Sequence, residues 1–197
     1  YYKMEYDKNC LIKEFELRQS KSQHELIKQL NILKSGISLD NKRRHSIITI
    51  EKMIASVSPH IPYDTRFTYS TWIVEETNNK KIKAIDIASL ITQESRFDHK
   101  AVSIVGAKGL GQIMPLTAKD ICEHLRIVYE PKMKFDPQMN IKMTAWYLNR
   151  LFNKYGNIEQ ALAYYNGGGR NAYRYRLHLK KNRGEEPTSD EEIHLKR

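Results

Sequence analysis

Apolar residues recur through most of the chain at intervals of three and four, which is the spacing of one face of an α-helix. No segment alternates apolar and polar residues for long enough to demand a sheet, and only residues 102–105 resemble a short strand. The sequence therefore predicts a mainly α-helical fold. The clearest stripes are Ile87, Leu90 and Ile91, and then Ile141, Ala145, Leu148 and Leu151.

Turn-forming residues divide these stripes into separate helices. Asparagines and lysines at 78–81 predict a turn, a glycine-punctuated stretch follows at 102–115, and Gly156 is a natural helix end. A last helical segment runs into three glycines at 167–169. We expect the preceding helices at residues 67–77, 83–95, 116–127 and 137–155.

The N-terminal part of the chain has helical patterns of its own. Residues 8–34 predict one or two amphipathic helices. Gly36 within the polar, basic run 34–46 predicts a loop, and residues 47–57 predict another helix that ends before Pro59. These segments carry no recognisable chemistry, so we expect them to pack or to bind a partner.

The length of 197 residues suits one domain plus an appendage and is enough to bury a sizeable core. We predict an N-terminal helical extension at 1–60, a helical domain at 61–180 and a polar tail at 181–197. No run of about 18 apolar residues is present, so the sequence predicts no membrane span. The chain begins with Tyr1 rather than Met, so the lack of a signal peptide does not argue for the cytoplasm.

The formal net charge is +10, and the excess of basic residues is concentrated toward the two ends of the chain. A basic protein is attracted to polyanions, which include nucleic acids, anionic lipid headgroups and acidic cell-wall polymers. The two cysteines, Cys10 and Cys122, form no CxxC pair, and Cys122 with His124 makes only two metal ligands. We therefore expect no metal and no cofactor, and the spacing leaves a disulfide open.

Glu94 lies on an apolar helical face. It follows Ile87, Leu90 and Ile91 by seven, four and three residues, which places it on the same side of the predicted helix. Either its carboxyl group reaches water at the edge of the core, or the fold holds it where hydration is poor. In the second case, desolvation raises the pKa of the carboxylic acid.

Two glycine-rich motifs accompany this acid. GAKGLGQIMP at 106–115 and AYYNGGG at 163–169 have backbones able to turn tightly and to approach a ligand closely. Aromatic faces stack on sugar rings, amides bond to hydroxyl and acetamido groups, and one acid can protonate a glycosidic oxygen. An acid, an amide, tyrosines and glycine-rich segments together indicate a sugar-binding site.

Three ordered motifs also resemble a known family. ITQESRFDHKAVSIVGAKGLGQIMPLTA at 91–118 is similar to the signature of the soluble lytic transglycosylases, a family of peptidoglycan-cleaving enzymes. FDPQMNIKMTAWYLNRL at 135–151 looks like that family's DP–NI–YL helix, and ALAYYNGGGR at 161–170 looks like its A-YN-G motif. The resemblance covers about residues 65–175 and implies a goose-type, lysozyme-like helical catalytic domain.

The resemblance implies roles for single residues. Glu94 occupies the position of the family's one catalytic acid, and Ser103 that of a serine that orients the reacting muramic residue. The positions that line the substrate site are Gln112, Met114, Tyr165 and Asn166.

Three further residues bear on the structure of the site. We expect Ser95 to bond to the backbone near the end of its helix, and Gly109 to let the loop turn. Gly111 departs from the family, which usually has a bulkier residue such as Met there, and this predicts a wider or softer wall.

Most glycosidases use two carboxylates. The candidates to partner Glu94 are outside the glycine and tyrosine motifs, so a mechanism with one carboxylate is the simplest interpretation. The resemblance implies the same: the acid protonates the leaving oxygen of a MurNAc-β-1,4-GlcNAc bond and then deprotonates the C6 hydroxyl of the muramic residue. The product is a 1,6-anhydromuramic end. The candidate partners are Asp98, Asp120, Glu123 and Asp136.

Two alternatives stay open: a hydrolytic goose-type lysozyme, and a non-catalytic wall-binding scaffold of an envelope machine. In each case the partner is peptidoglycan and the location is the periplasm or cell envelope, with the N-terminal helices available to bind an envelope protein. The basic, tyrosine-containing tract 170–183 has no nucleic-acid-binding signature, so we expect no nucleic-acid partner and a solvated helix that helps to hold acidic wall polymers.

Overall fold

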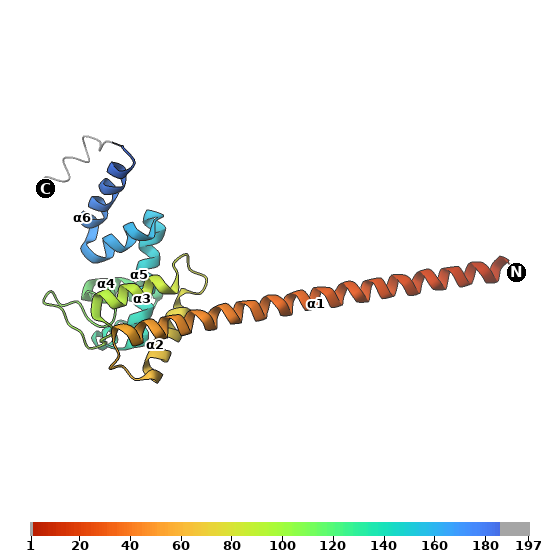
Figure 1. Cartoon of the computed structure of the whole chain (residues 1–197), viewed down its shortest axis with the longest axis horizontal. Helices are drawn as coiled ribbons and strands as arrows, with labels where there is room; N and C mark the ends of the chain where they lie inside the picture. The colour runs from red at the N-terminus through yellow and green to blue at the C-terminus, as the bar shows by residue number, and fades with distance from the viewer. Residues whose placement is uncertain (1, 186–197) are drawn as a thin grey trace. The chain divides into compact units, whose positions relative to one another are not determined.

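The computed structural model describes residues 2–185, with side chains from residue 17 onward. Every regular element within this range is helical, and the predicted mainly α-helical fold is confirmed (Figure 1). None of the described helices is long and apolar enough to cross a membrane. In chain order the elements are α1 (Tyr2–Val57), α2 (Tyr63–Thr77), α3 (Ala84–Ser95), α4 (Pro115–Leu125), the short 3₁₀ helix η1 (Pro131–Lys134), α5 (Pro137–Tyr155) and α6 (Ile158–Asn182).

Helix α1 is continuous, so the loop predicted at 34–46 is wrong. Gly36 lies inside the helix, where a glycine costs only about 1 kcal/mol relative to alanine. No proline falls within α1 to remove a backbone donor, and α1 ends at Val57, two residues before Pro59. The polar, basic run was therefore a change in surface chemistry and not a change in backbone structure.

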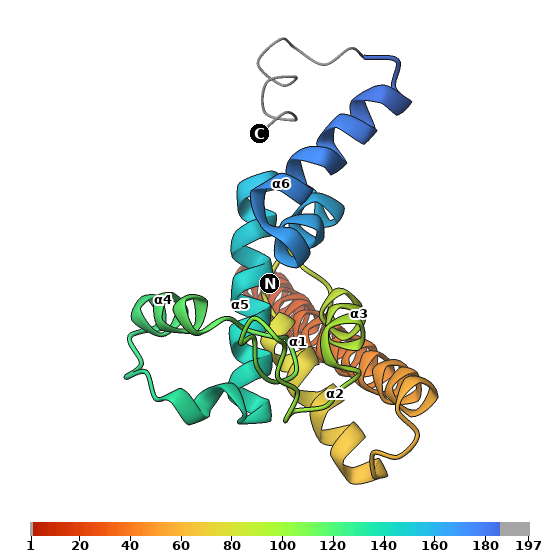
Figure 2. The same cartoon turned by 90° about the vertical axis from the view of Figure 1, so that its left-hand side faces the viewer.

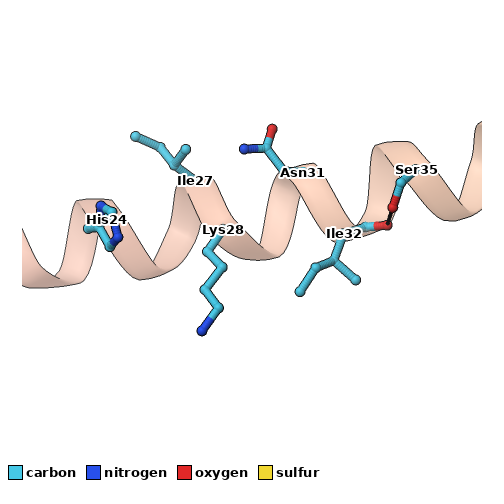
Figure 3. Close-up of a pocket in the computed structure, with 6 residues that line it drawn as sticks. All are labelled: His24, Ile27, Lys28, Asn31, Ile32 and Ser35. Carbon is cyan, nitrogen blue, oxygen red and sulfur yellow. Dashed lines mark hydrogen bonds between the residues drawn. The ribbon is translucent and has the colours of Figure 1, made fainter.

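The chain divides into two compact units, one up to His45 and one from Ser46. The first unit is helical, and the large apolar side chains at residues 17–45, the part of this unit whose side chains are described, are exposed. Figure 3 shows one part of it, where side chains from successive turns of a single helix point in different directions. These exposed large apolar side chains at 17–45 are Leu17, Leu26, Ile27, Leu30, Ile32, Leu33, Ile37 and Leu39.

The second unit holds the hydrophobic core. Ile50 and Ile54, from the last turns of α1, are buried in that core. The Arg66 side chain of α2 pairs with Glu51 of α1 at 2.7 Å between Nε and Oε1, and both groups are largely buried. The prediction that residues 1–60 form a separate extension, with a catalytic domain at 61–180, stays a prediction. The burial of Ile50 and Ile54 in this core concerns the boundary between the predicted extension and the predicted domain.

Helix α5 is the central element of the second unit, and it contacts α2, α3, α4, α6 and η1. Figure 2 shows α5 between α3 and α4. Asp136 caps its first turn by accepting a hydrogen bond from the Met139 amide at 2.7 Å. Gly156 ends the helix with a left-handed backbone (φ 70°), as the sequence predicted.

Residues 101–113 form an irregular loop between α3 and α4 that is closed by two isolated bridges. Lys108 pairs with Val102 on one side and with Ile113 on the other. The predicted strand at 102–105 is therefore wrong. The stretch turns back instead, because the Gly106 amide donates to the Ser103 carbonyl at 2.9 Å and closes a turn over residues 103–106.

Helix α6 contains a break at its glycines. Gly167 and Gly168 have non-helical backbone angles, and the second half of α6 continues in a new direction to Asn182 (Figure 2). Asn157 caps the first turn by accepting the Gln160 amide at 3.0 Å. The break places Tyr165 in the last helical turn before a bend.

Candidate active site

Glu94 lies in the last turn of α3 and is half-buried. Ile87, Leu90 and Ile91 on the same helical face are all buried in the core. Burial raises the pKa of the Glu94 carboxyl group, and it is the only cause of the rise. Of the two alternatives that the sequence left open for Glu94, the half-buried position and the raised pKa favour the poorly hydrated one.

A glycine-rich loop is fastened to α3 beside this acid. The Ser95 hydroxyl donates to the Leu110 carbonyl at 2.7 Å, which is a bond to backbone of the kind expected for a serine near a helix end. The next carbonyl, that of Gly111, accepts the Tyr165 hydroxyl of α6 at 2.7 Å. Two side chains from different helices thus hold adjacent carbonyl groups of the loop.

Asn140 of α5 holds the loop from its other side. This fully buried side chain accepts the Gly111 amide at 2.7 Å through Oδ1. Its Nδ2 donates to the Lys108 carbonyl at 3.1 Å and to the Lys134 carbonyl at 2.7 Å. The sequence analysis missed Asn140, although it is a polar residue in a helix with a strong apolar stripe.

Gly109 is required by this arrangement. Its φ of 75° strains any other residue, and a Cβ atom would overlap the Lys134 carbonyl and the Asn140 side chain. The structural role predicted for Gly109 therefore has a clear physical basis.

Gln112 also fastens the loop. Its Nε2 donates to the Gly109 carbonyl at 2.9 Å and to the Ala101 carbonyl at 3.1 Å. These bonds use both amide hydrogens within the loop. A contact between Gln112 and substrate stays a prediction, and the amide oxygen is the atom that could make it.

Gly111 does not leave the open space that the sequence predicted. A Cβ atom at this position would overlap the Thr144 hydroxyl oxygen, because the Thr144 side chain of α5 packs directly over it. Thr144 is fully buried, and its hydroxyl donates to the Asn140 carbonyl at 2.8 Å.

Tyr165 brings a phenol group to the same point. Its ring packs against Tyr147 with centroids 5.3 Å apart. Burial, and to a lesser degree the nearby Glu94 carboxylate, raise the pKa of Tyr165, whereas the adjacent Thr144 side chain lowers it in part. The Tyr165 phenol therefore stays protonated and lies within electrostatic reach of Glu94.

Three other predicted site residues lie on the surface of the unit or near it. Ser103 is half-buried, and its hydroxyl oxygen accepts the Ala107 amide at 3.0 Å, a bond that does not use the hydroxyl hydrogen. Met114, which precedes α4, is 40% exposed, and Asn166 is exposed beside the break in α6. Their contact with substrate stays a prediction.

Three of the four other candidate acids near the motifs make structural contacts. Asp98 accepts the Lys100 amide at 2.8 Å within its loop, and Asp136 caps α5. Asp120 pairs with Arg150 at 2.6 Å, and Glu123 is exposed on α4. No charge on a described acid contributes to the raised pKa of Glu94, so no second carboxylate is coupled to it there.

Within the described part of the chain, no cluster of three or more His, Cys, Asp or Glu residues is suited to a metal ion. Cys122 is buried with a free thiol, whereas the side chain of Cys10 is outside the described residues. His124 is exposed and bonds to the Asp120 carbonyl at 2.8 Å.

Comparisons with known proteins agree with this geometry. The family model for the transglycosylase SLT domain matches residues 71–187. The soluble lytic murein transglycosylase of Escherichia coli K12 is 32% identical over 115 residues, which cover 56% of this chain and 18% of that protein. A transglycosylase of Enterobacteria phage PRD1 is 34% identical over 82 residues, covering 42% of this chain and 28% of that protein.

A solved structure is similar as well. The crystal structure of the 70 kDa soluble lytic transglycosylase of Escherichia coli superposes with a TM-score of 0.51 at 28% identity, covering 69% of this chain and 24% of that one. The predicted fold class is therefore confirmed. The chain spans only 18% of the length of the curated Escherichia coli relative that it matches.

Proposed function

The chain belongs to the transglycosylase SLT domain family, and we propose that it is a lytic transglycosylase that cleaves the glycan strands of peptidoglycan. The observation that carries the proposal is Glu94, a half-buried acid whose pKa is raised by burial alone, beside a loop fastened by Ser95 and Tyr165. A single desolvated carboxyl group fits a reaction in which one residue acts first as an acid and then as a base.

In the first step, protonated Glu94 donates its proton to the glycosidic oxygen of the MurNAc-β-1,4-GlcNAc bond. The bond between C1 of the muramic residue and this oxygen breaks, and the GlcNAc side leaves as an alcohol. Glu94 becomes a carboxylate that faces an electron-poor C1. Its raised pKa shifts the equilibrium toward the protonated form that this step needs.

In the second step, the C6 hydroxyl of the same muramic residue attacks C1. The Glu94 carboxylate accepts the hydroxyl proton, which restores the protonated acid and leaves a 1,6-anhydromuramic end. No water is consumed, so a second carboxylate to activate water is unnecessary. This agrees with the structural roles of Asp98, Asp120 and Asp136.

Binding of the strand is proposed for the residues around the acid. Ser103 would orient the reacting muramic residue through its hydroxyl hydrogen, while Met114 and Asn166 offer exposed apolar and amide surface. Tyr165 would present its ring edge beside the acid, because its hydroxyl is held by the Gly111 carbonyl.

Digestion of purified sacculi, with mass spectrometry of the released muropeptides, tests the proposal. We expect wild type to release anhydro products, each lighter by one water than the hydrolytic product. Glu94→Gln removes the transferable proton and abolishes release, with an unchanged circular dichroism spectrum. Glu123→Gln, an exposed glutamate on α4, is the matched control and keeps wild-type activity.

The outcomes separate the alternatives. Reducing ends in place of anhydro ends identify a hydrolytic lysozyme. Binding to sacculi without any release by wild type identifies a non-catalytic scaffold. Release by Glu94→Gln at the wild-type rate contradicts the role of this acid.

Peptidoglycan as the substrate places the protein in the periplasm or at the cell envelope, which is part of the proposal. The basic second half of α6, residues 169–182, would hold acidic wall polymers. Because ionic strength screens exposed charges, binding of Glu94→Gln to sacculi is expected to weaken as salt is raised. The exposed apolar side chains of α1 would be covered by an envelope protein.

A further inference from the structure

Thr144 is a hydroxyl-bearing residue on the apolar face of α5. It lies three residues after Ile141 and four before Leu148, and both of these side chains are buried in the core. An aliphatic residue would fill this position without a polar group to satisfy. The position of Thr144 therefore calls for a reason beyond packing.

The side chain of Thr144 meets the loop at Gly111. Because it lies directly over Gly111, the loop can carry no side chain there, and the Gly111 backbone approaches α5 closely. At this point the Gly111 amide donates to Asn140 and the Gly111 carbonyl accepts Tyr165. Gly111 is thus held on three sides by side chains of α5 and α6.

Thr144 and Tyr165 hold the same residue of the loop. Thr144 donates to the Asn140 carbonyl at 2.8 Å, which fixes the orientation of its side chain over Gly111. The Tyr165 hydroxyl donates to the Gly111 carbonyl at 2.7 Å, and the neighbouring Leu110 carbonyl accepts the hydroxyl of Ser95, the residue next to Glu94. A change at Thr144 therefore reaches Tyr165 and the end of α3 through the loop backbone.

We propose that Thr144 is a positioning residue of the active site: its side chain keeps the loop backbone at Gly111 against α5, where the Gly111 carbonyl accepts the Tyr165 hydroxyl. Gly111 and Thr144 form a matched pair, in which the threonine occupies the volume that a side chain at position 111 would need. An effect of Thr144 on catalysis rests on the proposed function, whereas the packing of Thr144 over Gly111 does not depend on it.

Two substitutions separate the hydroxyl group from the volume. Thr144→Val keeps the shape and removes the hydroxyl, so we expect kcat on purified glycan strands to fall about tenfold with KM changed by less than about twofold. Thr144→Ser restores the hydroxyl and returns kcat to within about threefold of wild type. Ser70→Ala is the matched control, because Ser70 is also fully buried and bonds back to the Arg66 carbonyl at 2.8 Å in α2. This control lowers Tm and leaves kcat unchanged.

Two further measurements do not depend on activity. With ¹³C-labelled tyrosine, the ring resonance of Tyr165, assigned with Tyr165→Phe, shifts in Thr144→Val and returns in Thr144→Ser. In a double-mutant cycle, Gly111→Ala lowers Tm in wild type, and this loss is smaller in Thr144→Gly because the overlapping side chain is gone.

These measurements distinguish a failure of the proposed function from a failure of the proposed pairing between Gly111 and Thr144. If wild type does not cleave glycan strands, the proposed function fails and the pairing is judged by the resonance and the cycle alone. An unmoved Tyr165 resonance together with additive losses of Tm overturns the pairing. In an active enzyme, Thr144→Val with wild-type kcat overturns the positioning role.

Discussion

Replacement of Asn140 by alanine tests how the active-site loop is held. The substitution removes three hydrogen bonds, to the Gly111 amide and to the Lys134 and Lys108 carbonyls. The Lys108 carbonyl keeps the Ile113 amide at 3.0 Å as a partner. Among the described residues, Asn140 is the only partner of the other two groups, so the substitution leaves two buried backbone groups unsatisfied.

Each unsatisfied buried group costs about 1–3 kcal/mol, so we expect Asn140→Ala to lower the free energy of unfolding by about 4 kcal/mol. At about 2–4 °C per kcal/mol for a chain of this size, Tm falls by roughly 8–16 °C. The matched control is Asn157→Ala, which removes one helix cap at the start of α6 and costs about 1 kcal/mol.

Tryptophan fluorescence during denaturation is a suitable assay, because both tryptophans, Trp72 and Trp146, lie in the second unit. The signal therefore reports the unit that contains Asn140 and is not affected by melting of the first unit. The reasoning would be refuted if Asn140→Ala lowered the free energy of unfolding by no more than Asn157→Ala does. It would mean that water replaces the side chain at both groups.

Three further predictions use the same assay. The pKa of Glu94 is raised, so the folded protein binds this proton more tightly than the unfolded chain, and the free energy of unfolding falls as the pH rises through the folded pKa. Glu94→Gln, which cannot ionise, is therefore expected to be more stable than wild type at about pH 7. At about pH 4 the two proteins are expected to be equally stable. Gly109→Ala costs more than about 2 kcal/mol, since the positive φ and the overlap with Lys134 act together; a loss below about 1 kcal/mol counts against it. Arg66→Met leaves the Glu51 carboxylate buried without its cation and costs about 3 kcal/mol, and a neutral result contradicts this.

Helical periodicity predicted the parts of the structure that depend on local sequence. The stripe through Ile87 and Leu90 placed Glu94 at the edge of the core, and the raised pKa follows from that placement. The end of α5 was also predictable, because Gly156 favours a left-handed backbone. At these positions local preference and tertiary structure agree.

The same logic would have identified Asn140 and Thr144. Both are polar residues at helical spacing from buried apolar ones, as Glu94 is, yet only the charged residue drew attention. A polar group on a buried face must find a hydrogen bond, so it marks a place where another segment approaches. Sequence can show that such a partner exists, but not which segment supplies it.

Other features depend on contacts that no local pattern encodes. Gln112 adopts a φ of 48° and bonds within its own loop, which removes its amide hydrogens from the substrate. The overlap of Thr144 with the space above Gly111 joins residues 33 positions apart. In α1, the lone Gly36 did not break the helix because its neighbours are residues that a helix tolerates.

The central claim is that one carboxyl group, Glu94, completes the reaction with the substrate's own hydroxyl and without water. Digestion of sacculi in heavy-oxygen water, followed by mass spectrometry of the muropeptides, tests this most directly. The account predicts anhydromuramic ends that contain no heavy oxygen, and no product from Glu94→Gln. Reducing ends that carry heavy oxygen would show that water attacks C1, and would contradict the account.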